Sequence, residues 1–260
     1  SCAGGISKTA TSKKPVVAIC PIDPFCWPVR PSISKTLKKF VLGQDNEDHY
    51  QSIYFHDINA EKQKAFQTYI QNISNALKRF EEKNDVFPIL VGMERLDRKA
   101  CQAISDTYTK PLPMFISDDF LMDEMVSILH QASALVSSRF HAIVCSMIGI
   151  VPSAGITMDE RITNLLTERG DVDLLMKVDQ TDLEQRVFES LTKLFDQSEE
   201  IKTRIRNMIP REIKKMGQMG MAFSDEVSRI YPDFVPSVTS ESWQDYIPEL
   251  SPATKELLEN

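Results

Sequence analysis

The stretch from Ala134 to Gly170, ALVSSRFHAIVCSMIGIVPSAGITMDERITNLLTERG, decides the fold expected for this chain. It starts with a short apolar run over 134–137, which a sharp turn separates from a helical pattern opening at Ser138-Arg139-Phe140-His141. A second apolar run over 151–156 leads into a second helical pattern over 159–169. Two successive strand-then-helix units are typical of a parallel α/β sheet.

The polar residues of this stretch lie where such a sheet binds ligands. Arg139 and His141 follow a strand directly, so the sequence places them at the carboxyl edge of the sheet and in the first helical turn. Helix N-termini favour anions, an arginine offers a planar fork of donors, and a histidine exchanges a proton near neutral pH. The alternative for the same residues is an Arg139 paired with a neighbouring acid and a His141 packed on its helix.

The strand and helix alternation continues in both directions from this stretch. Short β-rich runs occupy 16–20, 86–91, 113–116 and, as an edge strand, 174–178, and amphipathic helical patterns occupy 34–42, 59–83, 97–105, 120–131 and 181–195. A weaker strand signal covers 52–55. The pattern predicts a doubly wound parallel sheet with helices on both faces, a Rossmann-like domain over residues 15–197.

Three segments depart from this alternation. Residues 1–14 are small and polar and read as a linker or a boundary segment. The segment PIDPFCWPVRPS at 21–32 has four prolines, which predicts irregular structure. Residues 198–260 form a predicted C-terminal helical extension, with a long apolar-striped helix over 199–230 and a short helix over 252–258.

Composition narrows the classes of function. The net charge of −7 argues against non-specific binding to nucleic acid or to an anionic membrane, and no apolar run reaches transmembrane length. The five cysteines form no CxxC pair, and no metal, P-loop or GxGxxG motif is present. We therefore predict a cytoplasmic protein without metal or cofactor, in which Cys20, Cys101 and Cys145 are buried, unpaired thiols.

Further candidate residues follow two other strands. Glu94, in the segment GMERLD after the strand at 86–91, is a candidate general base or hydroxyl ligand. The alternative is that Asp97 simply caps the next helix. In the proline-rich loop, Trp27 and Arg30 are candidate sugar-stacking and polar ligands, whereas a Trp27 that covers the core is the other interpretation.

Taken together, several of these segments resemble the polysaccharide pyruvyl transferase family. The resemblance rests on the strand–SxRxH–helix unit, the following VPS strand, the DER turn with Arg161, and ITNLLTERG; the VGM segment before Glu94 and Asp97 is also similar. It covers roughly 86–195 and, more loosely, 15–85. It implies the C-terminal Rossmann-like half of a GT-B-type architecture, with a possible upstream Rossmann-like domain as its partner.

The resemblance also implies an activity. Members of the family transfer the enolpyruvyl group of phosphoenolpyruvate to a sugar hydroxyl in polysaccharide or glycan biosynthesis, form a cyclic pyruvate ketal and release phosphate. Carried over, the Arg and His of the family's RxH motif, which hold the phosphoenolpyruvate anion, become Arg139 and His141. For this reaction we predict His141 and Glu94 as the catalytic residues. The predicted substrate-binding residues are Ser138, Arg139, Arg30, Trp27 and Arg161. Two alternatives stay open: a GT-B-type glycosyltransferase using a nucleotide-sugar, and a non-catalytic module of a larger protein.

Overall fold

A six-stranded parallel sheet forms the centre of the protein. The structure, a computed structural model, describes residues 14–43, 49–51 and 53–259. In order across the sheet the strands are β6 (Met114–Ile116), β5 (Phe87–Gly92), β1 (Val16–Cys20), β7 (Ala134–Ser137), β8 (Ser153–Thr157) and β9 (Leu175–Lys177). All five pairings are parallel, which confirms the predicted sheet and its edge strand.

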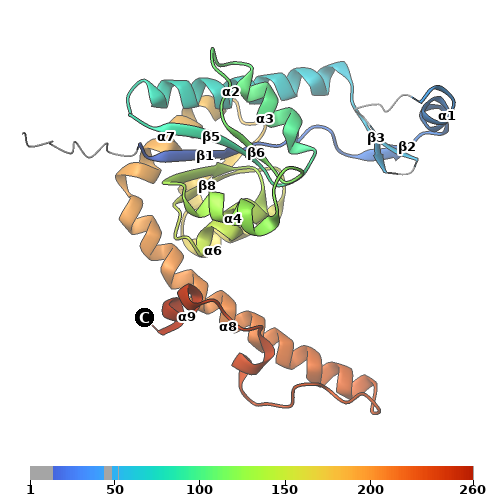
Figure 1. Ribbon diagram of the computed structural model, residues 1–260, viewed down its shortest axis with the longest axis vertical. Coiled ribbons are helices and arrows are strands. Elements are labelled where there is room, and N and C mark those ends of the chain that lie inside the picture. The colour runs from blue at the N-terminus through green and yellow to red at the C-terminus, as the bar shows by residue number, and fades with distance from the viewer. Residues whose placement is uncertain (1–13, 44–48, 52, 260) are drawn as a thin grey trace, which may run out of the picture.

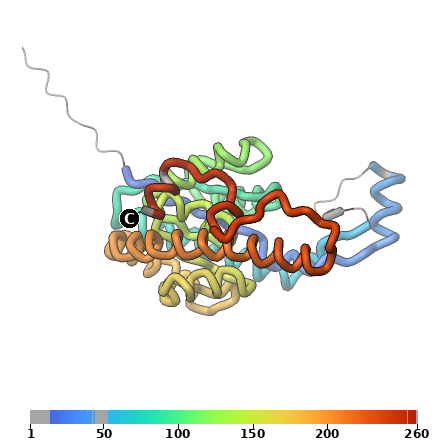
Figure 2. Tube along the Cα trace, turned by 90° about the horizontal axis from the view of Figure 1, so that it is seen from below, coloured from blue at the N-terminus to red at the C-terminus, as the bar shows by residue number. Residues whose placement is uncertain are grey.

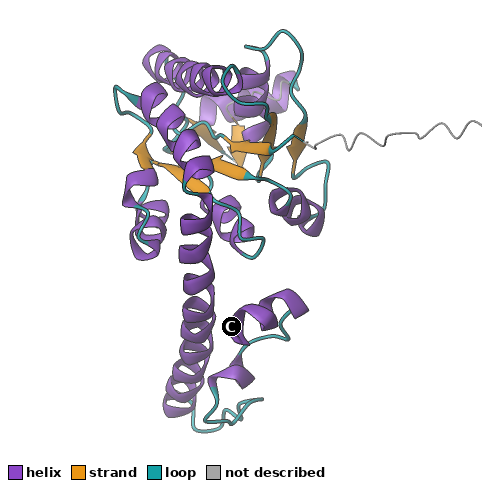
Figure 3. Cartoon of the chain, turned by 90° about the vertical axis from the view of Figure 1, so that its left-hand side faces the viewer, coloured by secondary structure: helices purple, strands orange, loops and turns teal. Residues whose placement is uncertain are grey.

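Helices cover both faces of this sheet, as the doubly wound pattern predicts (Figures 1 and 3). One face carries α2 (Ala60–Glu81), α3 (Asp97–Ser105) and α7 (Leu183–Asp196), and the other carries α4 (Met122–His130), α5 (Phe140–Met147) and α6 (Glu160–Arg169). Along the central strand β1, Val17 and Ile19 pack into the first layer, and Ala18 and Cys20 pack into the second. Burial on both faces explains why this strand is continuously apolar.

A second, smaller sheet corrects the expectation for the proline-rich segment. Val29–Pro31 forms strand β2, which pairs antiparallel with β4 (Tyr54–His56), and β4 pairs with β3 (His49–Gln51). The prolines are tolerated because β2 lies at the edge of its sheet and Pro31 is its last residue. This sheet and α1 (Ile33–Leu42) stand apart from the main sheet at one end of the molecule (Figures 1 and 2).

The C-terminal region is dominated by the long helix α8 (Ser198–Ile230), in agreement with the predicted helix. Its first turns join the core through Ile201, Ile205, Met208 and Ile209, and the remainder extends away from the sheet (Figure 3). The chain then returns along this helix through η2 (Trp243–Tyr246) and α9 (Pro252–Glu259). A short 3-10 turn, η1 (Val172–Leu174), precedes β9.

The cysteines follow the prediction with one exception. Cys20 and Cys101 are buried and free, as expected. Cys145 is also free but only half-buried, at the margin of the apolar cluster on its face of the sheet. In the described part of the chain, no helix is long and apolar enough to cross a membrane.

Candidate functional site

The turn between β7 and α5 is held by backbone and side-chain hydrogen bonds. The Ser137 hydroxyl donates to the carbonyl of Arg139 (2.9 Å) and accepts from its N–H (2.9 Å), and the Ser138 N–H donates to the Cys20 carbonyl (2.9 Å). Arg139 occupies the N-cap position of α5 in an extended conformation, and no side chain caps this helix in the described structure. The first-turn N–H groups of α5 therefore remain donors for a ligand.

Two carboxylates from the segment that follows β5 bind the side chain of Arg139. Its Nε donates to both oxygens of Asp97 (3.0 and 2.9 Å), and its Nη2 lies 2.5 Å from Asp97 Oδ1 and 3.0 Å from Glu94 Oε2. The Asp97 side chain is 1% exposed, the Arg139 side chain 23% and the Glu94 side chain 56%. The Asp97 carboxylate is thus fixed in a buried position, whereas the Glu94 carboxylate is in contact with solvent.

Asp97 is not the helix cap that the alternative interpretation of this residue predicts. The N-cap of α3 is Leu96, and Asp97 is the first helical residue, whose Oδ2 accepts the N–H of Glu94 (3.0 Å). Burial raises the pKa of Asp97, while the hydrogen bonds and positive charge of Arg139 oppose that rise. Burial lowers the pKa of Arg139, but its hydrogen bonds to Asp97 outweigh this and raise it overall. The pair is therefore an ion pair held in a partly dehydrated site.

Ser138 is held away from solvent. Its side chain forms a 2.7 Å hydrogen bond with the hydroxyl of Tyr69, a buried residue of α2. Burial raises the pKa of that tyrosine well above its ordinary value. The bond ties α2 to the β7–α5 turn, so Ser138 reaches a ligand only if this contact opens.

His141 and Arg161 lie at the entrance rather than inside. His141 is exposed in the first turn of α5, with its ring 5.5 Å from that of Phe140. The Arg161 guanidinium lies 5.8 Å from the centre of the same Phe140 ring and pairs with Asp159 at 2.6 Å. This pairing lowers the pKa of Asp159. His141 and Arg161 therefore flank Phe140 at the N-termini of two neighbouring helices.

A small cavity of about 70 Å³ lies beside Arg139. It brings Trp27 together with Glu94, Asp97 and Arg139, while Ser138, His141 and Arg161 lie outside its lining. Arg30 is also outside it, because its mostly exposed side chain faces Asp57 at 3.7 Å on the small sheet. The full lining is Ile22, Asp23, Cys26, Trp27, His56, Ile58, Glu94, Leu96, Asp97, Lys99, Arg139 and Met158.

Sequence reasoning missed the ion pair of Asp23 with Lys99 (3.2 Å) in this lining. The only signal was the position of Asp23 in the loop after β1, at the ligand edge of the sheet. Cys26 also contacts this cavity, and burial followed by the charge of Asp23 raises its pKa to about 11. Its thiol is therefore protonated at neutral pH, which makes a nucleophilic role unfavourable.

Hydrogen-bond donors, and not a cluster of metal ligands, gather at this edge of the sheet among the described residues. Among the described residues, no group of three or more histidine, cysteine or acidic side chains is placed to hold a metal ion. Arg139, the free end of α5 and His141 instead gather donors at one edge of the sheet.

Comparison with known proteins assigns no family to the chain. No protein-family model matches the sequence, and a search of curated proteins finds no match.

Proposed function

We propose that this chain carries the donor-binding half of a pyruvyl transferase, which moves the enolpyruvyl group of phosphoenolpyruvate to a sugar hydroxyl in glycan biosynthesis. One observation carries the proposal. Buried Asp97 fixes the Arg139 guanidinium at the carboxyl edge of the sheet. Exposed Glu94 contacts the same Nη2 of Arg139 that Asp97 binds, next to the uncapped start of α5. An anionic donor that replaces Glu94 meets an arginine already oriented for it.

Donor binding requires Glu94 to move. The cavity of about 70 Å³ is well below the range of about 300–1,000 Å³ that is typical of small-molecule sites. Because the Glu94 side chain is 56% exposed, it can turn outward without breaking the buried Arg139–Asp97 contact. The donor carboxylate or phosphate then takes its place on Arg139, and Arg161 at the start of α6 adds positive charge nearby.

The chemistry divides between two side chains. His141 protonates the methylene carbon of the donor, so that positive charge develops on the adjacent carbon that carries the phosphate. A sugar hydroxyl attacks this carbon, and the displaced Glu94 carboxylate accepts its proton. A second hydroxyl of the sugar then displaces phosphate and closes the cyclic ketal, and the proton of this hydroxyl leaves on the phosphate. Trp27, 41% exposed at the cavity, offers a stacking surface for the sugar, with Arg30 further out on β2.

The proposed function also includes an upstream partner domain and a cytoplasmic location. The small cavity leaves much of a donor and acceptor pair to be enclosed from outside this chain, which fits a second Rossmann-like domain facing the carboxyl edge of the sheet. The four described cysteines are all free, which is consistent with the reducing cytoplasm.

Calorimetric titration of phosphoenolpyruvate, with and without the upstream domain, tests this function. Glu94→Gln removes the competing charge from Arg139 and is expected to tighten donor binding by about tenfold, from the typical 1.5–3 kcal/mol of a charged hydrogen bond. Glu160→Gln, an exposed change on α6, is the matched control and should leave binding unaltered. His141→Gln should preserve binding and slow turnover by about 10²–10⁴-fold.

Two outcomes contradict the proposal. Binding of UDP- or GDP-sugars in place of phosphoenolpyruvate would favour the glycosyltransferase alternative. Tight association with the upstream domain, without donor binding or turnover, would favour a non-catalytic module.

A further inference from the structure

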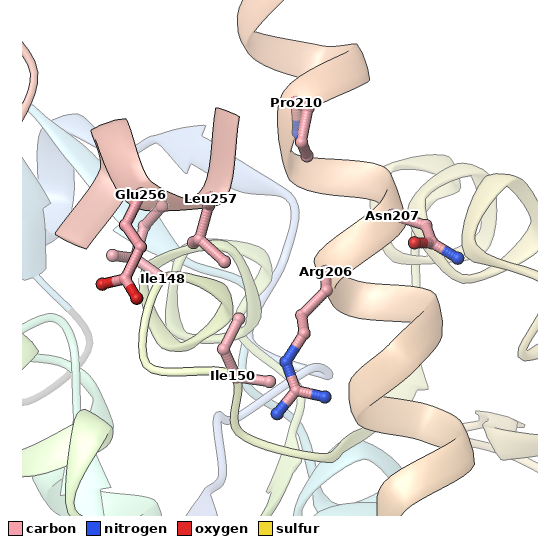
Figure 4. A pocket seen from close by; sticks show the side chains of 7 residues that line it. All are labelled: Ile148, Ile150, Arg206, Asn207, Pro210, Glu256 and Leu257. Carbon is pink, nitrogen blue, oxygen red and sulfur yellow. The ribbon is translucent and has the colours of Figure 1, made fainter. Parts of the chain in front are cut away.

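A second and much larger cavity lies between the C-terminal extension and the end of α5. It has a volume of about 670 Å³ and is lined by Ile148, Ile150, Arg206, Asn207, Pro210, Glu256 and Leu257. Figure 4 shows Arg206 reaching from α8 toward Ile150, with Glu256 and Leu257 of α9 across the cavity. Since α5 begins beside His141 and ends before Ile148, this cavity is distinct from the candidate site described above.

Arg206 differs from the other arginines because its exposed guanidinium meets no hydrogen-bond or ion-pair partner among the described residues and acts on Glu199 only through its charge, which helps to lower the pKa of that carboxyl. Every other arginine of the chain hydrogen-bonds or pairs with an acidic, amide or carbonyl group. Within the described residues, no hydrogen bond or ion pair reaches Arg206. The neighbouring Asn207 adds an amide with two further donors to the same wall. The cavity thus contains a guanidinium whose fork is available to a ligand.

The opposite wall includes a strained backbone position. Ile150 has a φ of 53°, in the left-handed region that a β-branched side chain rarely adopts. Its N–H donates to the Met147 carbonyl (2.8 Å) and closes the end of α5. The preceding Gly149 lies against His130, since a Cβ at Gly149 would come within 2.8 Å of that ring. The helix end therefore places an isoleucine where glycine is usual, with its side chain in the cavity lining.

We propose that this cavity binds a monocarboxylate with an apolar body. A carboxylate matches the planar fork of Arg206, and Ile148, Ile150 and Leu257 offer apolar walls for the rest of the molecule. The volume lies in the range of small-molecule sites, about 300–1,000 Å³. The apolar side chains of this lining favour a carboxylate with an apolar body over inorganic phosphate, which has no apolar surface to bury.

Titration of the full chain with hexanoate, octanoate and inorganic phosphate, followed by calorimetry and by the melting temperature, tests this site. We expect saturable octanoate binding that is tighter than hexanoate binding, because the longer chain buries more apolar surface. Arg206→Gln should weaken octanoate binding by about 10- to 100-fold through loss of a charged hydrogen bond. Arg229→Gln, which removes an exposed arginine further along the same helix, is the matched control.

Leu257→Ser provides a second variant that leaves the guanidinium in place. It should weaken octanoate binding more than hexanoate binding, which separates the apolar wall from the charge. The proposal is overturned if octanoate does not saturate the wild-type chain, if Arg206→Gln binds it as tightly as Arg229→Gln, or if phosphate competes with it on equal terms. None of these results depends on phosphoenolpyruvate binding at the carboxyl edge.

Discussion

Replacing Arg139 with methionine tests the ion pair at the candidate site. Methionine keeps an unbranched apolar stem but removes every hydrogen bond that Arg139 donates to Asp97, whose side chain is 1% exposed. The Asp97 carboxylate then keeps only the N–H of Glu94 at 3.0 Å as a donor. From the sequence alone, Arg139 lies at the ligand-binding edge of the sheet, and its replacement should change stability little. Because its partner Asp97 is buried in the structure, we instead expect a large loss of stability.

The magnitude follows from the burial of the two side chains. Removing one partner of a buried ion pair costs about 3–5 kcal/mol, because the remaining charge stays in a poorly solvated place. The Arg139 side chain retains 23% of its exposure, so water replaces part of the lost interaction. We expect a loss of about 3 kcal/mol at neutral pH, which a domain with a typical 5–15 kcal/mol of stability survives in folded form.

The loss should depend on pH with a definite sign. Burial raises the pKa of Asp97 above its ordinary 3.8, and Arg139 opposes that rise, so the variant has a still higher folded-state pKa. A raised folded-state pKa favours the protonated acid, and this favourable contribution disappears as the pH rises through that pKa. The variant should therefore be close to wild type near pH 4 and progressively less stable toward pH 8.

Urea unfolding at several pH values measures this difference. Arg95→Met serves as the control, since Arg95 is 84% exposed and lies 3.8 Å from Asp118, and it should change stability by less than about 1 kcal/mol at every pH. A loss for Arg139→Met no larger than that of the control, or one that is constant from pH 4 to pH 8, would refute the reasoning.

Two further predictions concern other parts of the fold. Gly155→Ala should lower stability by about 1–3 kcal/mol in thermal unfolding, because a Cβ in β8 would overlap the Ile162 side chain of α6; an unchanged melting temperature would show that this contact relaxes freely. Cys26, with its pKa raised to about 11, should react with iodoacetamide at least about 100-fold more slowly than free cysteine at pH 7.5. Its rate should still be rising at pH 9.5, and a plateau below pH 8.5 would contradict the raised pKa.

Some of these features could be read from local sequence. The residues of β1 form a continuous apolar run, and the buried side chains of α2 repeat at helical spacing, so burial left a recognisable pattern in each segment. The strands and helices of the main sheet were predictable for that reason. The placement of Glu94 and Arg139 at the same edge also followed, because parallel strands bring their carboxyl ends together.

Other features depend on contacts between distant segments. The prolines of 21–32 gave no sign of strand β2, since its pairing partner β4 lies more than twenty residues away. The positive φ of Ile150 and the close approach of His130 to Gly149 are likewise indicated by no local pattern. Cys145 was predicted to be buried because its neighbours in the sequence are apolar. Its actual burial is only partial, because burial depends on which distant segments pack against α5.

The sequence by itself thus determined the sheet class, the run of helices and the edge at which Arg139 and His141 lie, because hydrophobic period and strand-to-helix turns are properties of neighbouring residues. Only the tertiary structure decided that Arg139 is held by Asp97 and Glu94, from a segment about forty residues earlier, and that Arg206 lines a cavity. Ion pairs and cavities are set by side chains that meet across the fold. Their energies depend on burial, which no single segment specifies.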